Sequence, residues 1–170
     1  MSGVPTSEPP QGILWLASYP KSGNTWTRAF LNKLLRILRG EDDGEAQRIN
    51  RINEYTVWDI AAKRYQHHLG KPPKEADRAE IAKLRPVIQA EIADYTEGLA
   101  LVKTHHALVM DRGHPAINFA VTSGAIYIVR NPLDVAISYA NHLGSSIDHA
   151  INEMSVRNRE TTVTDESVYE

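Results

Sequence analysis

The 170-residue sequence contains no cysteine, and this absence excludes several kinds of chemistry. Without thiols there is no disulfide framework, no thiol nucleophile, no cysteine-ligated zinc and no iron–sulfur cluster. The lack of cysteine fits a reducing compartment, and we expect the protein to be cytoplasmic. A chain of this length can bury a sizeable core without a disulfide or a structural metal.

An excess of charge and long apolar runs are also missing. Lys and Arg number 19 and Asp and Glu 21, so the net charge is −2, which argues against nucleic acid as a partner. No apolar run exceeds five residues, whereas a membrane-spanning helix needs roughly 20. Residues 1–12 carry neither the basic nor the apolar region of a signal peptide, and we expect them to form a disordered leader.

What the sequence does contain is an alternation of apolar runs and helical patterns. Three short runs without polar alternation are predicted to be strands buried on both faces: residues 13–18, 99–102 and 125–129. Four stretches are predicted to be helical: residues 25–38, 54–70, 74–97 with a boundary or kink at Pro86, and 132–143. Residues 111–124 are predicted to be a loop. This alternation predicts an α/β domain with a parallel sheet over residues 13–150, followed by a partial helix and polar tail over residues 151–170.

The first predicted helix has a regular apolar stripe. It is formed by side chains at four-residue intervals: Trp26, Phe30, Leu34 and Leu38. Side chains spaced in this way lie on one face of a helix.

Between the first strand and the first helix lies a polar turn, Tyr-Pro-Lys-Ser-Gly-Asn-Thr-Trp, at residues 19–26. A helix N-terminus presents unpaired N–H groups and a positive dipole end, Gly23 allows close approach of an anion, and Lys21 adds a charge. Further donors follow in the same turn: Ser22, Asn24 and Thr25. The turn therefore predicts an oxyanion cradle, the alternative being an ordinary capped turn with an exposed lysine. The lysine precedes the glycine, unlike a Walker A motif, and this argues against a P-loop kinase.

The third strand also ends in a polar cluster. Arg130 leaves the strand where the next helix begins, so its guanidinium can bind a phosphate there. Ser138 lies within that helix and can donate to the same anion. The alternatives are an ion pair between Arg130 and Asp134 and a solvent-facing Ser138.

The second strand runs into Lys103-Thr104-His105-His106. A histidine at a strand end titrates near neutrality and suits proton abstraction from a hydroxyl or amine. The alternative is a structural or surface histidine. Adjacent histidines diverge on a helix or strand, so neither this pair nor His67-His68 makes a good metal site.

Taken in order, the segments YPKSGNTW, LVKTHH and IYIVRNPLDVAISY resemble the cytosolic-type sulfotransferases that use 3′-phosphoadenylyl sulfate (PAPS). The resemblance covers residues 13 to about 150, and residues 57–69 and 84–89 resemble the bacterial branch of the family. It implies a P-loop-like, three-layer α/β/α fold around a parallel sheet. It also implies sulfuryl transfer to a hydroxyl or amine of a small-molecule acceptor, with adenosine 3′,5′-bisphosphate (PAP) as the second product.

The resemblance implies roles for individual residues of the nucleotide site. Residues 21–26 match the loop that holds the 5′-phosphosulfate, with Lys21 at the bridging oxygen and Trp26 against the adenine. Arg130 and Ser138 match the pair that holds the 3′-phosphate.

The same resemblance implies that His105 is the catalytic base and that Lys103 assists at the sulfuryl group, without a metal. Two positions depart from the family pattern. Asn24 replaces a common threonine and His106 replaces a common asparagine, which leaves open whether His106 competes as the base.

Family members continue past the position of Glu170 with further helices, a strand and an Arg-Lys-Gly loop that completes the nucleotide site. We therefore expect the C-terminal part of the domain to be missing. An incomplete domain would expose apolar surface and favour a homo-oligomer or a complementing chain as partner. The alternative function is an inactive or incomplete sulfotransferase-like protein that binds nucleotide or a partner.

Overall fold

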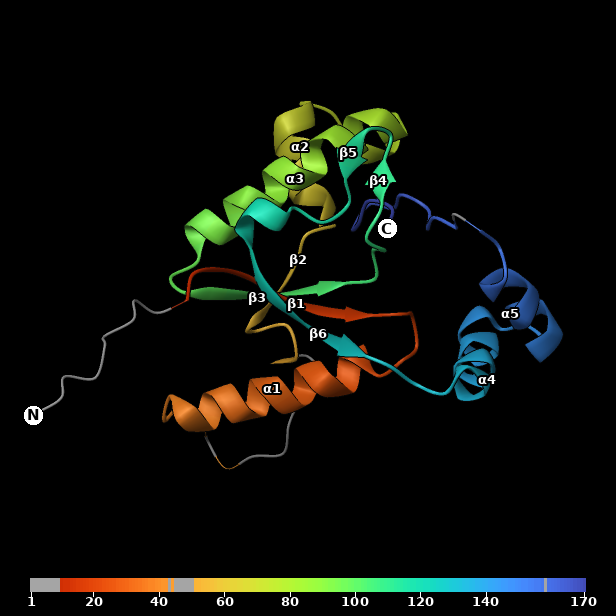
Figure 1. Cartoon of the computed structure of the whole chain (residues 1–170), viewed down its shortest axis with the longest axis horizontal. Helices are drawn as coiled ribbons and strands as arrows, with labels where there is room; N and C mark the ends of the chain where they lie inside the picture. The colour runs from red at the N-terminus through yellow and green to blue at the C-terminus, as the bar shows by residue number, and fades with distance from the viewer. Residues whose placement is uncertain (1–9, 43, 45–50, 158) are drawn as a thin grey trace, which may run out of the picture.

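The computed structural model describes residues 10–42, 44, 51–157 and 159–170, so most of the expected leader lies outside the described residues. The described chain is an α/β fold with a central, fully parallel sheet and helices on both faces (Figure 1), as the sequence predicts. The strands follow one another across the sheet in the order β2 (Thr56–Trp58), β3 (Leu99–Thr104), β1 (Gly12–Ser18) and β6 (Thr122–Ile128). Among the described helices, none is long and apolar enough to cross a membrane.

The register of the sheet brings the polar turns together. β1 pairs with β3 on one side, through Ala17 and Thr104, and with β6 on the other, through Ser18 and Ile128. Because the strands are parallel, their carboxyl ends meet at one edge of the sheet, where open α/β sheets place their sites.

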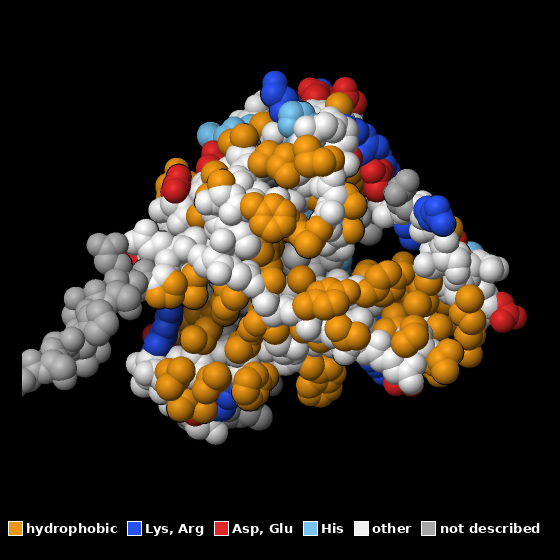
Figure 2. Space-filling model, viewed as in Figure 1, with side chains coloured by type: hydrophobic (Ala, Val, Ile, Leu, Met, Phe, Trp, Pro, Cys, Tyr) orange, Lys and Arg blue, Asp and Glu red, His pale blue; other side chains and the backbone are white. Residues whose placement is uncertain are grey.

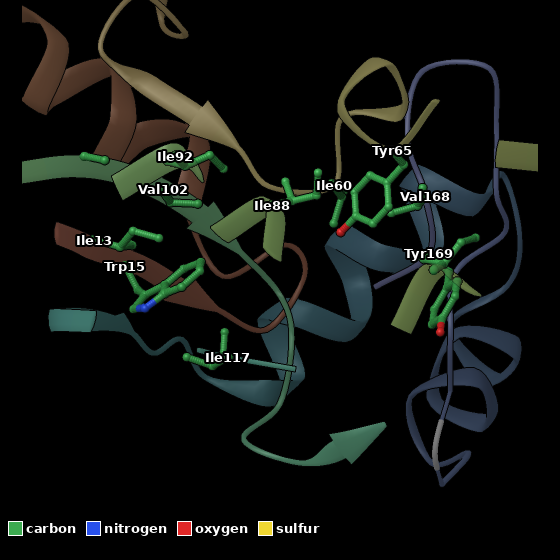
Figure 3. Close-up of a cluster of buried hydrophobic side chains, with 12 residues drawn as sticks. Ile13, Trp15, Ile60, Tyr65, Ile88, Ile92, Val102, Ile117, Val168 and Tyr169 are labelled. Carbon is green, nitrogen blue, oxygen red and sulfur yellow. The ribbon is translucent and has the colours of Figure 1, made fainter. Parts of the chain in front are cut away.

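The main core lies between the sheet and two helices on one face, α2 (Ala62–Leu69) and α3 (Arg78–Tyr95). Figure 3 shows its labelled side chains, and Val168 and Tyr169 from the end of the chain lie among them beside Tyr65. Val168 is fully buried and its N–H donates to the carbonyl of Ile60 at 2.8 Å. Residues 168 and 169, predicted to belong to a polar tail, are therefore part of the core. Burying an apolar side chain of this size contributes about 1.5–3 kcal/mol to the free energy of unfolding.

α3 begins at a capping box, in which Asp77 and Glu80 each accept the other's backbone N–H. The helix continues through Pro86 rather than ending there. A proline inside a helix costs about 3 kcal/mol, and here the buried side chains of Ile81, Ile88 and Ile92 hold the helix on the sheet.

The predicted helix over residues 54–70 is wrong in its first half. Residues 56–58 form β2 instead and pair with β3. Thr, Val and Trp are β-branched or aromatic and favour a strand once a partner strand is available. Residues 111–124 are predicted to be a loop, but they contain regular elements. The end of β4 (Met110–Asp111) pairs with β5 (His114–Pro115), and η3 (Phe119–Val121) and the first residues of β6 follow.

α1 (Asn24–Leu38) covers the other face of the sheet, with its apolar stripe turned away from the sheet. Trp26 and Phe30 are 82% and 64% exposed, whereas Arg28 and Arg36 are buried. Arg28 Nη1 donates to Asn53 Oδ1 at 2.6 Å and Arg36 Nη2 to the carbonyl of Glu41 at 2.8 Å, so each buried guanidinium has at least one polar partner in the segment that follows the helix. The helix therefore turns its polar face inward and its apolar stripe outward.

β6 also differs from the prediction of a strand buried on both faces. It is an edge strand of the described sheet, and Tyr127 is 70% exposed. Figure 2 shows apolar side chains gathered on this side of the molecule, over α1, over the β6 edge and over α4 (Pro132–Leu143).

α4 begins with Pro132 in its first turn, as predicted, and leads to α5 (Ile147–Met154). A single turn, η2 (Pro73–Glu75), precedes α3.

Candidate active site

A cleft of about 1340 Å³ opens at the carboxyl edge of the sheet. All but one of the residues predicted to act in the site line it: Lys21, Gly23, Asn24, Thr25, Trp26, Lys103, His105, Arg130 and Ser138. The exception is Ser22, which is buried beneath the turn. The cleft is larger than the roughly 300–1000 Å³ typical of a single-ligand pocket, so it has room for two substrates.

The turn before α1 has the geometry of an anion cradle. Gly23 is the N-cap at φ 111°, and no side chain caps the helix, so its first N–H groups are open to a ligand. A Cβ at Gly23 would meet only Ile128 Cγ2, at 3.9 Å, and the glycine is therefore required by its backbone angle and not by space. Lys21 has φ 66°, a left-handed conformation that is strained for a lysine.

Asn24 attaches the cradle to β1 instead of facing the cleft with its amide. Its Nδ2 donates to the carbonyl of Leu16 at 2.9 Å and approaches Ser18 Oγ at 3.3 Å. Its backbone N–H is left for a ligand. Thr25 and Trp26 are exposed, so the indole face is open for stacking.

Arg130 lies beside the cradle but belongs to a different segment of the chain. It follows β6, and its Nη1 donates to the carbonyl of Lys21 at 3.2 Å. In the described structure this contact replaces the ion pair with Asp134 considered as an alternative. A guanidinium has five N–H donors, so others can bind an anion. Ser138 is half-buried on α4 and lines the same cleft.

His105 is held in one tautomer by β1. Its Nδ1 lies 2.7 Å from the carbonyl oxygen of Ser18 and 3.2 Å from Ser18 Oγ. A carbonyl oxygen only accepts, so Nδ1 carries the hydrogen and Nε2 keeps its lone pair. Burial lowers the pKa of His105, and the charge of Lys103 lowers it further. The imidazole is therefore neutral at neutral pH and able to take a proton.

Lys103 and His105 share a carboxylate that the sequence analysis missed. Glu170 Oε1 lies 3.0 Å from Lys103 Nζ, and Glu170 Oε2 accepts the backbone N–H of His105 at 3.2 Å. Burial acts to raise the pKa of Glu170, but the charge and hydrogen bond of Lys103, together with the neighbouring His105, outweigh it and hold the pKa below its ordinary value. Lys103 Nζ also lies 5.4 Å from the ring centroid of Trp58, within cation–π range.

His106 occupies a different environment from His105. Burial lowers its pKa to about 3, so it is neutral at neutral pH. Its Nε2 is buried without a hydrogen-bond partner in the described structure, and its backbone N–H donates to Thr104 Oγ1 at 3.0 Å.

The inner wall of the cleft holds a buried ion pair. Arg85 is 1% exposed, and its Nη1 lies 2.8 Å from Asp111 Oδ2. The Tyr169 hydroxyl donates to the same carboxylate oxygen at 2.7 Å. In the part of the chain that the structure describes, no group of three His, Asp or Glu residues is placed to hold a metal.

Sequence reasoning missed several of these residues for different reasons. Ser18 could have been found, because the strand before it is the neighbour of the strand before His105 in a parallel sheet. Glu170 and Tyr169 give no local signal, since they come from a segment that returns to the sheet from far along the chain. Arg85 looks like an ordinary helix residue until its burial is known.

Comparison of the sequence with known protein families gives one match. A family model described as a sulfotransferase domain matches residues 12–165. This match agrees with the resemblance drawn from the three motifs. No curated protein sequence matches the chain.

Proposed function

Because the chain belongs to the sulfotransferase family, we propose that it moves a sulfuryl group from PAPS to a hydroxyl or amine of a small-molecule acceptor. The observation that carries the proposal is one cleft lined by an open N–H cradle and a histidine held in the tautomer of a base. Binding of an anion and abstraction of a proton are the two tasks that sulfuryl transfer requires of the protein.

The cradle residues fit the nucleotide in their chemistry. The N–H groups at the start of α1 and the Lys21 ammonium suit the 5′-phosphosulfate. Arg130 and Ser138 supply donors for the 3′-phosphate, and the exposed Trp26 ring offers a surface for the adenine. When bound, PAPS supplies an activated sulfuryl group, with PAP as the leaving group.

His105 acts as the base in this proposal. Its Nε2 takes the proton from the acceptor hydroxyl or amine as the new bond to sulfur forms and the bond to the bridging oxygen breaks. The Ser18 carbonyl holds the ring throughout, because Nδ1–H stays hydrogen-bonded to it. Lys21 offsets the negative charge that develops on the leaving oxygen, and Lys103 offsets charge at the sulfuryl oxygens.

A second candidate function is nucleotide or partner binding without transfer. It is favoured by the apolar side chains exposed over α1 and β6, a surface typical of an interaction site. Transfer of sulfate from PAPS, measured on the chain itself, separates the two functions.

PAP should bind the chain, and the Lys21→Ala and Arg130→Ala variants should each bind it about 10- to 100-fold more weakly. A charge-assisted hydrogen bond contributes about 1.5–3 kcal/mol, which sets this range. Isothermal titration calorimetry with PAP measures the effect. Lys83→Ala, on the exposed side of α3, serves as the charge-matched control and should bind normally. Failure of the folded chain to bind PAP would contradict the nucleotide assignment.

Turnover should fall as the pH drops through the pKa of His105. Burial and the Lys103 charge hold this pKa below the ordinary 6.5, and only the neutral imidazole accepts a proton. The rate should therefore be level above pH 6.5 and decline only in more acidic buffer. Release of PAP from PAPS, followed with a panel of phenols, alcohols, amines and sugars, gives the profile. An acidic limb centred above pH 6.5 would contradict the assignment of His105 as base.

A further inference from the structure

The Glu170 carboxylate is the only acidic group that contacts both Lys103 and His105 among the described residues. The Lys103 and Glu170 side chains are 11% and 8% exposed, so both charges have lost most of their water. Burying a charge is unfavourable unless it is paired and hydrogen-bonded, and a buried pair is often no more stable than apolar residues in its place. Stability alone therefore does not explain why the Lys103–Glu170 ion pair lies beside the proposed base.

Glu170 is held firmly enough to position other groups. Its backbone N–H donates to Thr161 Oγ1 at 3.0 Å, and its carbonyl accepts the N–H of Thr161 at 3.1 Å. The two preceding residues, Val168 and Tyr169, are 0% and 2% exposed and belong to the core. The core therefore fixes where the carboxylate lies.

Both the main chain and the ring of His105 are therefore held by hydrogen bonds. Its backbone N–H donates to Glu170 Oε2, and its ring Nδ1 donates to the Ser18 carbonyl. Lys103 is similarly located between the Glu170 carboxylate and the Trp58 ring. An ammonium has three N–H donors, so this pairing still leaves donors for a ligand in the cleft.

We propose that Glu170 is a positioning residue of this site, which holds Lys103 and the His105 main chain in place and offsets the positive charge around the base. The proposal rests on the proposed function of the site. Lys103 on β3 and Arg28 on α1 are the cations that face His105, Ser18 on β1 presents a carbonyl, and Glu170 brings the one negative charge among these groups. When His105 accepts a proton, the imidazolium forms beside two cations, and Glu170 lowers the cost of that charge.

Glu170→Gln is the most direct test, because glutamine keeps an oxygen for the His105 N–H and loses only the charge. The pKa of His105 should fall in this variant, since the Lys103 charge is no longer offset. NMR titration of the His105 ring measures this without any substrate. Glu170→Asp should restore part of the shift, and Lys103→Met combined with Glu170→Gln should move the pKa back up.

Turnover by Glu170→Gln should fall about 10- to 100-fold, because the base is weaker and less well placed, and its acidic limb should move to lower pH. PAP affinity should stay within twofold of the unmodified chain, since Glu170 does not contact the cradle. Glu160→Gln is the matched control: this carboxylate lines the same cleft and pairs with Arg112, not with Lys103. The control should leave both the His105 pKa and turnover unchanged.

The proposal would be overturned by a His105 pKa that stays constant or rises in folded Glu170→Gln. It would equally be overturned by a normal turnover and pH profile in that variant. If the unmodified chain neither binds PAP nor transfers sulfate, the proposed function fails. The NMR titration then still decides whether Glu170 controls the protonation of His105.

Discussion

His105→Ala should lower turnover by about 10²- to 10⁴-fold, the usual contribution of a general base. His105 is the cleft histidine whose Nδ1–H is tied to a main-chain carbonyl, which directs the lone pair to Nε2. PAP affinity should change little, because the predicted nucleotide contacts lie in the cradle and at Arg130. Single-turnover transfer from PAPS, together with PAP titration, separates loss of chemistry from loss of binding.

His106→Asn is the control for this experiment. Its imidazole is neutral, with a pKa of about 3, and its Nε2 is buried without a partner in the described chain. Turnover should therefore remain within a few-fold of the unmodified protein. If His106→Asn were as inactive as His105→Ala while staying folded, the base would have to be reassigned to His106.

Arg85→Met should lower the free energy of unfolding by about 1.5–3 kcal/mol, because it removes a buried, charge-assisted hydrogen bond and leaves Asp111 with only the Tyr169 hydroxyl and the more exposed Arg112 as partners. Arg85 is 1% exposed and pairs with Asp111, whose side chain is 13% exposed. The guanidinium carbon also lies 5.0 Å from the Tyr169 ring centroid, so a cation–π contact is lost as well. Urea unfolding followed by circular dichroism measures the loss.

Arg112→Met provides the comparison, because Arg112 pairs with the same Asp111 from a position that is 36% exposed. An exposed pair contributes about 0–1 kcal/mol, so this variant should be much milder. Arg85→Met combined with Asp111→Leu should recover part of the stability, because it also removes the carboxylate that has lost its buried partner. Equal, small losses in Arg85→Met and Arg112→Met would show that burial of the pair has no energetic consequence.

The parts of the site that could be predicted from the sequence are local. A short apolar strand, a Gly-containing turn and a helix start follow one another within residues 13–26, and each is determined by its own neighbours. The same holds for Pro132, whose fixed backbone angle marks the start of α4. Because parallel strands align their carboxyl ends, the three polar turns could also be expected to meet.

The orientation of α1 could not be predicted in this way. Its periodicity shows that one face is apolar, but periodicity does not say which face is covered. The inward position of Arg28 depends on Asn53, a residue 25 positions later in the chain. The sequence pattern of a short apolar strand such as β6 likewise does not show whether the strand lies at the centre of a sheet or at its edge. Glu170 was missed because its contacts with Lys103 and His105 span more than sixty residues.

The left-handed backbone of Lys21 has a consequence for how a ligand would be received. A strained conformation of this kind stores on the order of 1–3 kcal/mol, which is met by the rest of the fold as the chain folds. The turn thus already has its final shape, and an incoming anion loses little affinity to the ordering of a loop. Preorganisation of this kind makes the entropy of binding more favourable, and differences in affinity among related ligands would then arise mainly from how fast they leave.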